Sequence, residues 1–283
     1  MFQPDLLAGR RILVTGGGSG LGAAMAARFA ELGAHLLLCG RRADVLDATA
    51  ATLRETCRNT GAQVDTAVCD VRDAAAVEAL VDAQWAVAPI DVLVNNAAAT
   101  FIARTETLSA RAADAILATT LHGAMYCTLA LGKRWIAQQR PGAVLSILST
   151  STRTGRAFTV PSAMAKSGLL AMTRSLAVEW GGRGVRLNAI APGPFPTAGA
   201  WERLVPKPEL AAAFEAKNPL KRAGEHGELA NLACYLLAKE SGYINGEVVT
   251  IDGGEWLQGA GQFNFVGEHM SDADWDALKP KKK

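Results

Sequence analysis

The sequence predicts a single α/β domain, residues 1–283, built on a doubly wound parallel sheet. Short apolar runs alternate with longer amphipathic stretches along nearly the whole chain, and a glycine cluster follows the first apolar run. About half of the residues, 49%, are hydrophobic, which is enough for a well-filled core. Strands that are buried on both faces by crossover helices have this pattern, so we expect a parallel sheet with helices on each side.

The expected elements follow one another as strand, helix and strand along the chain. The first strand begins at Arg11, and a helix over 23–32 and a strand over 35–39 complete the first βαβ unit. Further helices are expected at about 43–60, 73–87, 109–138, 162–180 and 225–239, and strands at 63–68, 90–94, 142–149, 185–190 and 247–251. The less regular stretch at about 192–219 is expected to form a lid over the carboxyl ends of the strands, where such sheets bind ligands.

Composition and charge narrow the functional classes. The 29 basic and 27 acidic residues give a formal charge of +2, which is too small to favour nucleic acid or an anionic membrane as a partner. The sequence shows neither a leader pattern nor an apolar run that is long enough to span a bilayer, so we expect a cytoplasmic protein without a membrane span. The five cysteines include no CxxC pair, so we expect reduced core thiols and no metal site.

The glycine cluster joins the first strand to the first helix. Its spacing, GxxxGxG over 16–22, lets the backbone approach a pyrophosphate at the amino end of a helix, as in Rossmann-type folds. A tight turn alone would also use glycines, but the position between strand and helix favours a dinucleotide. The residues that we assign to it are Thr15, Gly16, Gly18, Ser19, Gly20, Leu21 and Gly22.

Two arginines follow the second strand, where the adenosine ribose of a dinucleotide lies in this fold. An acidic residue there would bond the ribose 2′-hydroxyl, whereas an arginine accommodates a 2′-phosphate. Arg41 and Arg42 occupy this position without an acid. A surface arginine pair is the alternative interpretation, but the position favours NADP(H) over NAD(H) as the cofactor.

Several motifs follow one another at the expected strand ends and helix starts: the glycine loop, Asp70-Val71, Asn95-Asn96-Ala97, Ser149, Lys166 and Pro192-Gly193. Taken together in this order, they make the chain resemble the short-chain dehydrogenase/reductase family over nearly its whole length. The resemblance implies that Asp70 contacts adenine and that Lys166 holds the nicotinamide ribose. It also implies cofactor contacts for Val71, Asn96, Ala97, Pro192, Gly193, Pro194 and Phe195.

The family's usual Tyr-x-x-x-Lys motif is altered, because Ser162 stands four residues before Lys166. The 2,4-dienoyl-CoA reductases resemble the chain in this departure. The match extends over 158–166, 177–180 and 197–204, and continues past the usual family end at 261–264. This branch implies an acyl-CoA substrate and a place in fatty acid β-oxidation.

The same resemblance assigns residues to the acyl-CoA. Its phosphates would contact Arg72 and Arg203, with Arg41 as a further contact, although surface salt bridges are the alternative for such arginines. Phe101, Ser109 and Ser162 would line the acyl cleft.

Two catalytic positions differ from the mitochondrial type of that branch. Thr100 and Ser151 stand where that type has an asparagine and a tyrosine, which hold the thioester carbonyl. We therefore expect Ser149, Ser151 and Thr100 to donate hydrogen bonds to a developing enolate, directly or through water. Lys166 would orient the ribose and lower the cost of negative charge.

The sequence thus predicts an NADPH-dependent reductase of an unsaturated acyl-CoA. Two alternatives remain: a carbonyl/alcohol oxidoreductase, disfavoured by the missing tyrosine, and a non-catalytic protein that binds NADP(H) and acyl-CoA. His122 and Tyr126, one helical turn apart, are an alternative proton-donor pair, although aromatic residues at this spacing more often pack together. The resemblance suggests a homotetramer through the helices at 109–138 and 162–180. The motifs do not specify acyl length or double-bond position.

Overall fold

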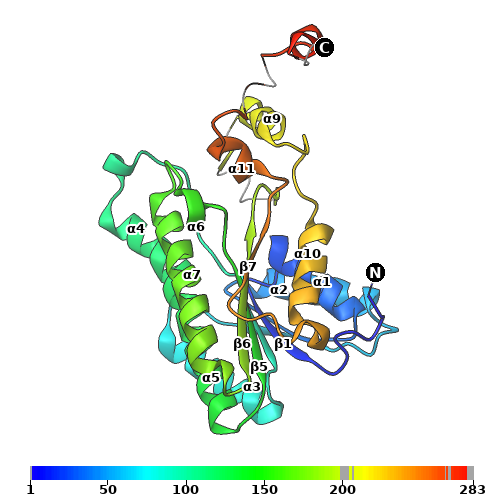
Figure 1. The fold of residues 1–283 in the computed structure, drawn as a ribbon. Coiled ribbons are helices and arrows are strands. Elements are labelled where there is room, and N and C mark those ends of the chain that lie inside the picture. The colour runs from blue at the N-terminus through cyan, green and yellow to red at the C-terminus, as the bar shows by residue number, and fades with distance from the viewer. Residues whose placement is uncertain (1, 198–203, 206, 265, 267–268, 279–283) are drawn as a thin grey trace.

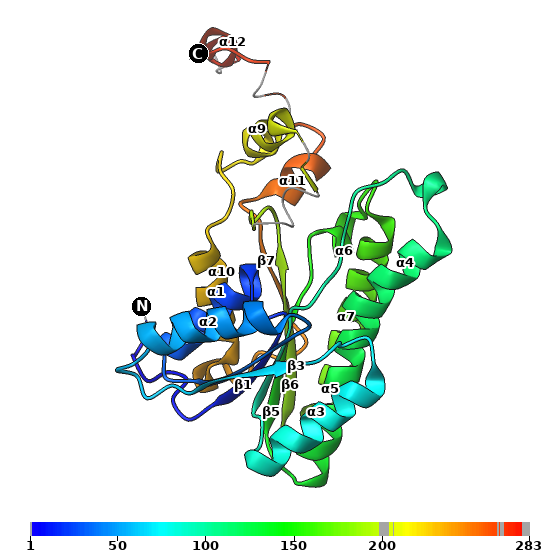
Figure 2. The same ribbon diagram turned by 180° about the vertical axis from the view of Figure 1, so that it is seen from behind.

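The computed structural model describes residues 2–197, 204–205, 207–264, 266 and 269–278. Its strands are β1 (Arg11–Thr15), β2 (His35–Gly40), β3 (Val64–Val68), β4 (Val92–Asn95), β5 (Gly142–Ile147), β6 (Val185–Pro192) and β7 (Val248–Ile251). They form one parallel sheet in the order β3-β2-β1-β4-β5-β6-β7 (Figures 1 and 2). The strand order reverses between β1 and β4, which is the point where doubly wound sheets bind ligands. The predicted fold class is confirmed.

Helices cover both faces of this sheet. They are α1 (Gly20–Glu31), α2 (Ala43–Thr56), α3 (Ala74–Val87), α4 (Ala110–Leu117), α5 (Gly123–Ala137), α6 (Ser151–Thr154), α7 (Val160–Gly181), α9 (Pro208–Lys217), α10 (His226–Leu237), α11 (Glu255–Ala260) and α12 (Asp272–Ala277), with short turns η1 (Thr105–Thr107), η2 (Ala118–His122) and η3 (Lys239–Ser241). Helices α1, α2 and α10 lie on one face, and α3, α5 and α7 lie on the other (Figures 1 and 2).

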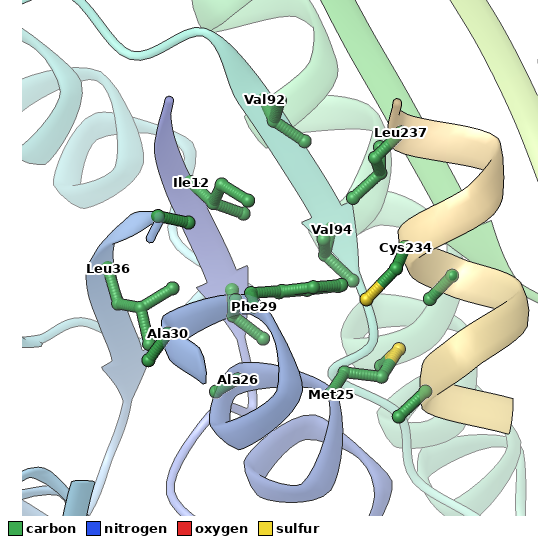
Figure 3. Close-up of a cluster of buried hydrophobic side chains, with 14 of the residues drawn as sticks. Ile12, Met25, Ala26, Phe29, Ala30, Leu36, Val92, Val94, Cys234 and Leu237 are labelled. Carbon is green, nitrogen blue, oxygen red and sulfur yellow. The ribbon is translucent and has the colours of Figure 1, made fainter. Parts of the chain in front are cut away.

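Successive residues of the central strands alternate between the two helix layers. In β1, Ile12 and Val14 pack on the side of α1, while Leu13 packs on the side of α5. Figure 3 shows Phe29 of α1 extending toward Val94 of β4 and Cys234 of α10. Because side chains alternate along a strand, both faces of this sheet must be apolar, which accounts for the unbroken apolar runs of the sequence.

The helix expected at 109–138 is present but contains a π-helical turn, η2, between α4 and α5. Thr120 lies buried in this turn, and its hydroxyl accepts a hydrogen bond from the N–H of Ala99 at 3.0 Å. Such turns are frequent at functional sites. The sequence did not predict the turn because the helical pattern of apolar residues continues on both sides of it.

By length and composition the run Ala110–Ala137 could cross a membrane, and half of its apolar 18-residue stretch is buried inside the protein. Its first part, α4, packs against α7, and α5 packs against α3. These contacts account for its apolar residues. All five cysteines are buried thiols without a disulfide, in agreement with the sequence prediction.

The expected lid at 192–219 lies partly outside the described residues, because 198–203 and 206 are not among them. The described part contains α9, which lies beside α11 beyond the carboxyl ends of the strands (Figures 1 and 2). The short helices α6 and α11 were not expected from the sequence. The lid role of this segment stays a prediction.

Candidate active site

A cavity of about 780 Å³ lies at the carboxyl ends of the strands. Its walls include the β1–α1 loop, the ends of β2, β5 and β6, the start of α7 and the residues that follow β3 and β4. Because all the strands run in the same direction, segments that are distant in the sequence meet at this one edge of the sheet.

The glycine loop forms one wall of the cavity. Gly16, Gly18, Ser19, Gly20 and Leu21 line it. Gly16 has a φ of +65°, which glycine adopts without strain. The side chain of Ser19, the N-cap residue of α1, does not cap the first turn of the helix, so the first-turn amides of α1 remain available to an anion.

Two residues that we assigned to the cofactor, Thr15 and Gly22, lie behind this wall. The hydroxyl of Thr15 donates to the carbonyl of Val94 at 3.1 Å and accepts from the N–H groups of Asn96 and Ala97 at 3.0 and 3.1 Å. A Cβ on Gly22 would lie 2.3 Å from the carbonyl oxygen of Gly16. They therefore shape the loop from below, whereas Asn96 and Ala97 line the cavity themselves.

The end of the cavity near β2 and β3 carries several charges. Arg41 and Arg42 are exposed and line it, as does Asp70. The guanidinium of Arg72 donates from Nε to both carboxylate oxygens of Asp70, at 2.9 and 3.0 Å, and these bonds lower the pKa of that carboxyl. Arg72 itself is not among the described lining residues, and it forms an ion pair with Asp70, which agrees with the alternative interpretation of this arginine as part of a surface salt bridge.

The opposite end of the cavity holds the four residues that we predicted to act in catalysis. Thr100, Ser149, Ser151 and Lys166 all line it, together with Ser162. The hydroxyls of Ser149 and Ser151 are hydrogen-bonded to each other, and the N–H of Ser151 donates to Ser149 Oγ at 3.2 Å. The loop after β5 therefore presents a bonded pair of hydroxyls opposite α7.

Lys166 is the buried cation of this end of the cavity. Its ammonium group donates to the carbonyl of Ile147, the last residue of β5. Burial lowers the pKa of Lys166 to about 8, because a charged ammonium loses solvation inside the protein. At neutral pH the group is still mostly protonated, so it contributes a positive charge to the cavity.

The remaining predicted residues differ in where they lie. Val71, Pro192 and Phe195 line the same cavity, while Gly193 and Pro194 line smaller cavities beside it. Phe101 and Ser109 are not among its described lining residues; Ser109 instead caps α4, accepting from the N–H of Ala112 at 3.2 Å. Arg203 lies outside the described residues.

Among the polar residues of the cavity that sequence reasoning missed are Arg156 and Thr159. Both lie on the loop between α6 and α7, and their closeness in sequence to Ser151 and Ser162 is the signal that could have found them. The buried Thr159 hydroxyl has no hydrogen-bond partner among the residues that the structure describes.

His122 and Tyr126 lie outside the described lining of the cavity. Their rings pack at a tilt, with centroids 6.2 Å apart. This arrangement agrees with the interpretation of the pair as a packed helix surface.

Comparison with known proteins shows which family and which relatives this chain resembles. Residues 16–255 match the family model described as "Enoyl-(Acyl carrier protein) reductase". The "Probable 2,4-dienoyl-CoA reductase [(2E)-enoyl-CoA-producing]" of Bacillus subtilis is 40% identical, and the match covers 88% of this chain and 97% of the relative. The gluconate 5-dehydrogenase of Gluconobacter oxydans is 32% identical over 90% of this chain and 98% of the relative.

A solved structure shares the same fold. It is a protein of Beutenbergia cavernae with bound NADP, described as a candidate NAD(P)-dependent gluconate 5-dehydrogenase. Its TM-score is 0.84 at 32% identity, and the match covers 90% of this chain and all of the other. The relatives thus include reductases of unsaturated thioesters and dehydrogenases of sugar acids.

Proposed function

Because the chain belongs to the short-chain dehydrogenase/reductase family, we propose that it is an NADPH-dependent reductase of unsaturated acyl-CoA, of the 2,4-dienoyl-CoA type. The family makes the chain an oxidoreductase with a nicotinamide cofactor. The choice of a thioester substrate rests on the reaction end of the cavity and on the dienoyl-CoA reductases among its relatives.

The observation that supports a thioester substrate over an alcohol or ketone is the absence of a phenol from the cavity. The protein has three tyrosines, Tyr126, Tyr235 and Tyr243; all of them are described, and none lines the cavity. A serine hydroxyl, as in Ser162, is far less acidic than a phenol with its pKa of about 10, so it is a poor acid or base for interconverting alcohols and ketones. Reduction of a conjugated thioester needs only hydrogen-bond donors for the enolate oxygen, and a proton that water can supply.

The site fits the nicotinamide cofactor on structural grounds. The glycine loop can accommodate a pyrophosphate beside the first turn of α1, because Gly16, Gly18 and Gly20 line the cavity without side chains. Arg41 and Arg42 would bind the 2′-phosphate, and Lys166 would hold the nicotinamide ribose. When bound, NADPH supplies the hydride.

The chain's own residues would then stabilise the charge that develops on the thioester oxygen. The bonded pair Ser149 and Ser151 has a hydroxyl proton free to donate, because one of its two protons is used within the pair. Thr100, on the loop after β4, offers a second donor. The ammonium of Lys166 lowers the cost of the negative charge without giving up its proton.

A single-turnover experiment tests the proposal. NADPH-loaded protein is mixed with a 2,4-dienoyl-CoA in a stopped-flow instrument, and loss of NADPH absorbance is followed. We expect oxidation in the wild type, none in Lys166→Ala, and appreciable activity in Ser162→Ala, because Ser162 has neither the acidity nor the reach of a phenol. Ser151→Tyr, which restores a phenol at the position of the branch's tyrosine, is expected to raise turnover.

The same experiment separates the two alternatives. Oxidation of NADPH by ketones but not by dienoyl-CoA would favour a carbonyl/alcohol oxidoreductase, as the relationship to a gluconate 5-dehydrogenase would suggest. Binding of dienoyl-CoA without oxidation, in both the wild type and Ser151→Tyr, would favour a non-catalytic binder. A homotetramer in the cytoplasm is part of the proposal, and sedimentation and fractionation test those two points.

A further inference from the structure

A second cavity of about 360 Å³ opens beside the reaction end of the first. The two cavities share three wall residues, Ser151, Arg156 and Pro192. The other walls of the second cavity come from α6 and the loop before it, from α9 and from α11; they include Thr150, Thr154, Phe214, Glu255, Trp256 and Ala260. A ligand whose reacting atoms lie near Ser151 can therefore extend into this second space.

Two opposite charges stand on the walls of this second cavity. Glu255 is half-buried, and burial raises the pKa of its carboxyl; the positive charge of Arg156 opposes this rise, and the negative charge of Asp252 adds to it. Among the described residues, the guanidinium of Arg156 forms no hydrogen bond, and no carboxylate lies within 4 Å of it. The guanidinium and the carboxyl thus interact across the cavity without closing it.

The outer wall of the second cavity is held in place by contacts of its own. The guanidinium of Arg153 lies over the ring of Trp256, 5.2 Å from its centroid, and so joins α6 to α11. The carboxylate of Asp252 accepts from the N–H groups of Gly254 and Trp256 at 2.9 and 3.0 Å. These bonds fix the start of α11, so the position of Glu255 is set before a ligand enters.

The volume of the second cavity limits which part of an acyl-CoA, the acyl group or the coenzyme A, can enter it. Coenzyme A is itself an adenine nucleotide with a long arm, so its bulk is comparable to that of the dinucleotide that the proposed function assigns to the 780 Å³ cavity. The second cavity has less than half of that volume. It can hold an acyl end and not the carrier.

We propose that the second cavity binds the end of the acyl group distal to the thioester, and that Arg156 and Glu255 select acyl groups with a hydroxyl there over plain alkyl chains. The inference rests on the proposed function, because it presumes a thioester at Ser151. A hydroxyl accepts from the guanidinium and donates to the carboxylate. An alkyl chain displaces water from both charged groups and replaces none of the hydrogen bonds that they made to it, so its binding carries an uncompensated desolvation free energy.

Binding measurements on a matched pair of ligands test this selectivity. The ligands are two 2,4-dienoyl-CoA thioesters of equal length, one with a hydroxyl near the distal end, titrated by calorimetry into protein loaded with NADP⁺. We expect the hydroxylated thioester to bind the wild type roughly tenfold more tightly or better, because a site built around a hydroxyl rejects the analogue that lacks it. In Arg156→Met the ratio of the two dissociation constants is expected to fall toward one.

Two further variants keep the result interpretable. Arg183→Met removes an exposed arginine that lines neither cavity and should leave the ratio unchanged. Glu255→Met removes the carboxylate from the opposite wall and should lower the ratio independently of Arg156. Equal affinities in the wild type, or a preference that survives in both Arg156→Met and Glu255→Met, would overturn the inference.

The outcome also separates this inference from the proposed function. If neither thioester oxidises bound NADPH but the hydroxylated one binds more tightly, the reductase proposal fails and the selective cavity stands. If both thioesters are reduced with equal dissociation constants, the reductase proposal stands and the selective cavity fails.

Discussion

The polar side chains of the larger cavity fall into two groups: some already form hydrogen bonds within the protein, and others do not. Asp70 is bound by Arg72, and Lys166 donates to the carbonyl of Ile147. In the described part of the chain, no hydrogen bond or ion pair engages the guanidinium of Arg41 or Arg42. The first group is fixed by the fold, whereas the second is available to a ligand, so substitutions in the two groups should have different effects.

Arg41→Ala should reduce the preference for NADPH over NADH. A charge-assisted hydrogen bond to the 2′-phosphate contributes about 1.5 to 3 kcal/mol, so the ratio of the two dissociation constants should fall by roughly 10- to 100-fold. Fluorescence titration with each cofactor measures this ratio. Arg58→Ala, which removes an exposed arginine near Glu55 at the end of α2, is the matched control. Equal binding of NADH and NADPH by the wild type would refute the assignment.

The lowered pKa of Lys166 gives the stability of the protein a specific pH dependence. Its folded-state pKa of about 8 lies below the unfolded value of about 10.4. Below pH 8 the lysine is charged in both states, so the folded state carries the cost of a buried charge; the cost disappears as the pH rises to the unfolded pKa. Relative to Lys166→Met, the free energy of unfolding of the wild type should rise by about 3 kcal/mol between pH 8 and 10.4.

Urea unfolding of the cofactor-free protein and of Lys166→Met across this range measures the difference. The cysteines titrate in both proteins and cancel in the comparison. A difference that does not vary with pH would show that the ammonium is better solvated than its burial indicates.

At the scale of elements, the glycine loop depends on the close approach of β1, α1 and the loop after β4. The side-chain amide of Asn96 donates to the carbonyls of Thr15 and Gly16, at 3.0 and 3.2 Å. A Cβ on Gly22 would lie 2.5 Å from that amide nitrogen and 2.3 Å from the carbonyl oxygen of Gly16. The loop and the first turn of α1 are thus held as one unit.

Gly22→Ala should therefore weaken both folding and cofactor binding. The collision is with backbone and with a bonded amide, so we expect a loss of about 1 to 3 kcal/mol of stability, as for other overpacked sites. Gly182→Ala is the control, since that residue has helical backbone angles and a Cβ would meet nothing within 4 Å. Thermal unfolding and NADPH titration of the two variants give the comparison; equal behaviour would contradict the packing argument.

At the scale of the whole molecule, the cavity joins the glycine loop, the end of β2 and the start of α7 on one sheet edge. A ligand that bridges these segments binds only the folded chain. NADPH at 100 times its dissociation constant should stabilise the protein by about 2.7 kcal/mol, and NADH at the same concentration should stabilise it less. Thermal unfolding with each cofactor measures the effect. An equal shift with both cofactors, or none, would speak against the arginine pair as a phosphate site.

The sequence by itself determined the order of strands and helices, the glycine loop and the position of Lys166. Each of these can be read from a short stretch of the sequence: apolar periodicity indicates which faces are buried, and glycines mark the left-handed backbone at Gly16 and the tight packing at Gly22. Because apolar periodicity also shows where a strand ends, residues that follow a strand could be predicted to lie at the ligand-binding edge of the sheet. Thr100 and Ser149 are two such residues, and both line the cavity.

Only the tertiary structure decided how side chains from different segments pair. Asn96 donates to the carbonyl of Thr15, and Lys166 donates to the carbonyl of Ile147, because packing brings together polar atoms that lie far apart along the chain. The π-helical turn likewise satisfies the N–H of Ala99, a residue distant in sequence. The second cavity, lined by Arg156 and by residues of α11, exists because segments far apart in the sequence meet beyond the sheet, and a local pattern of apolar residues does not predict that contact.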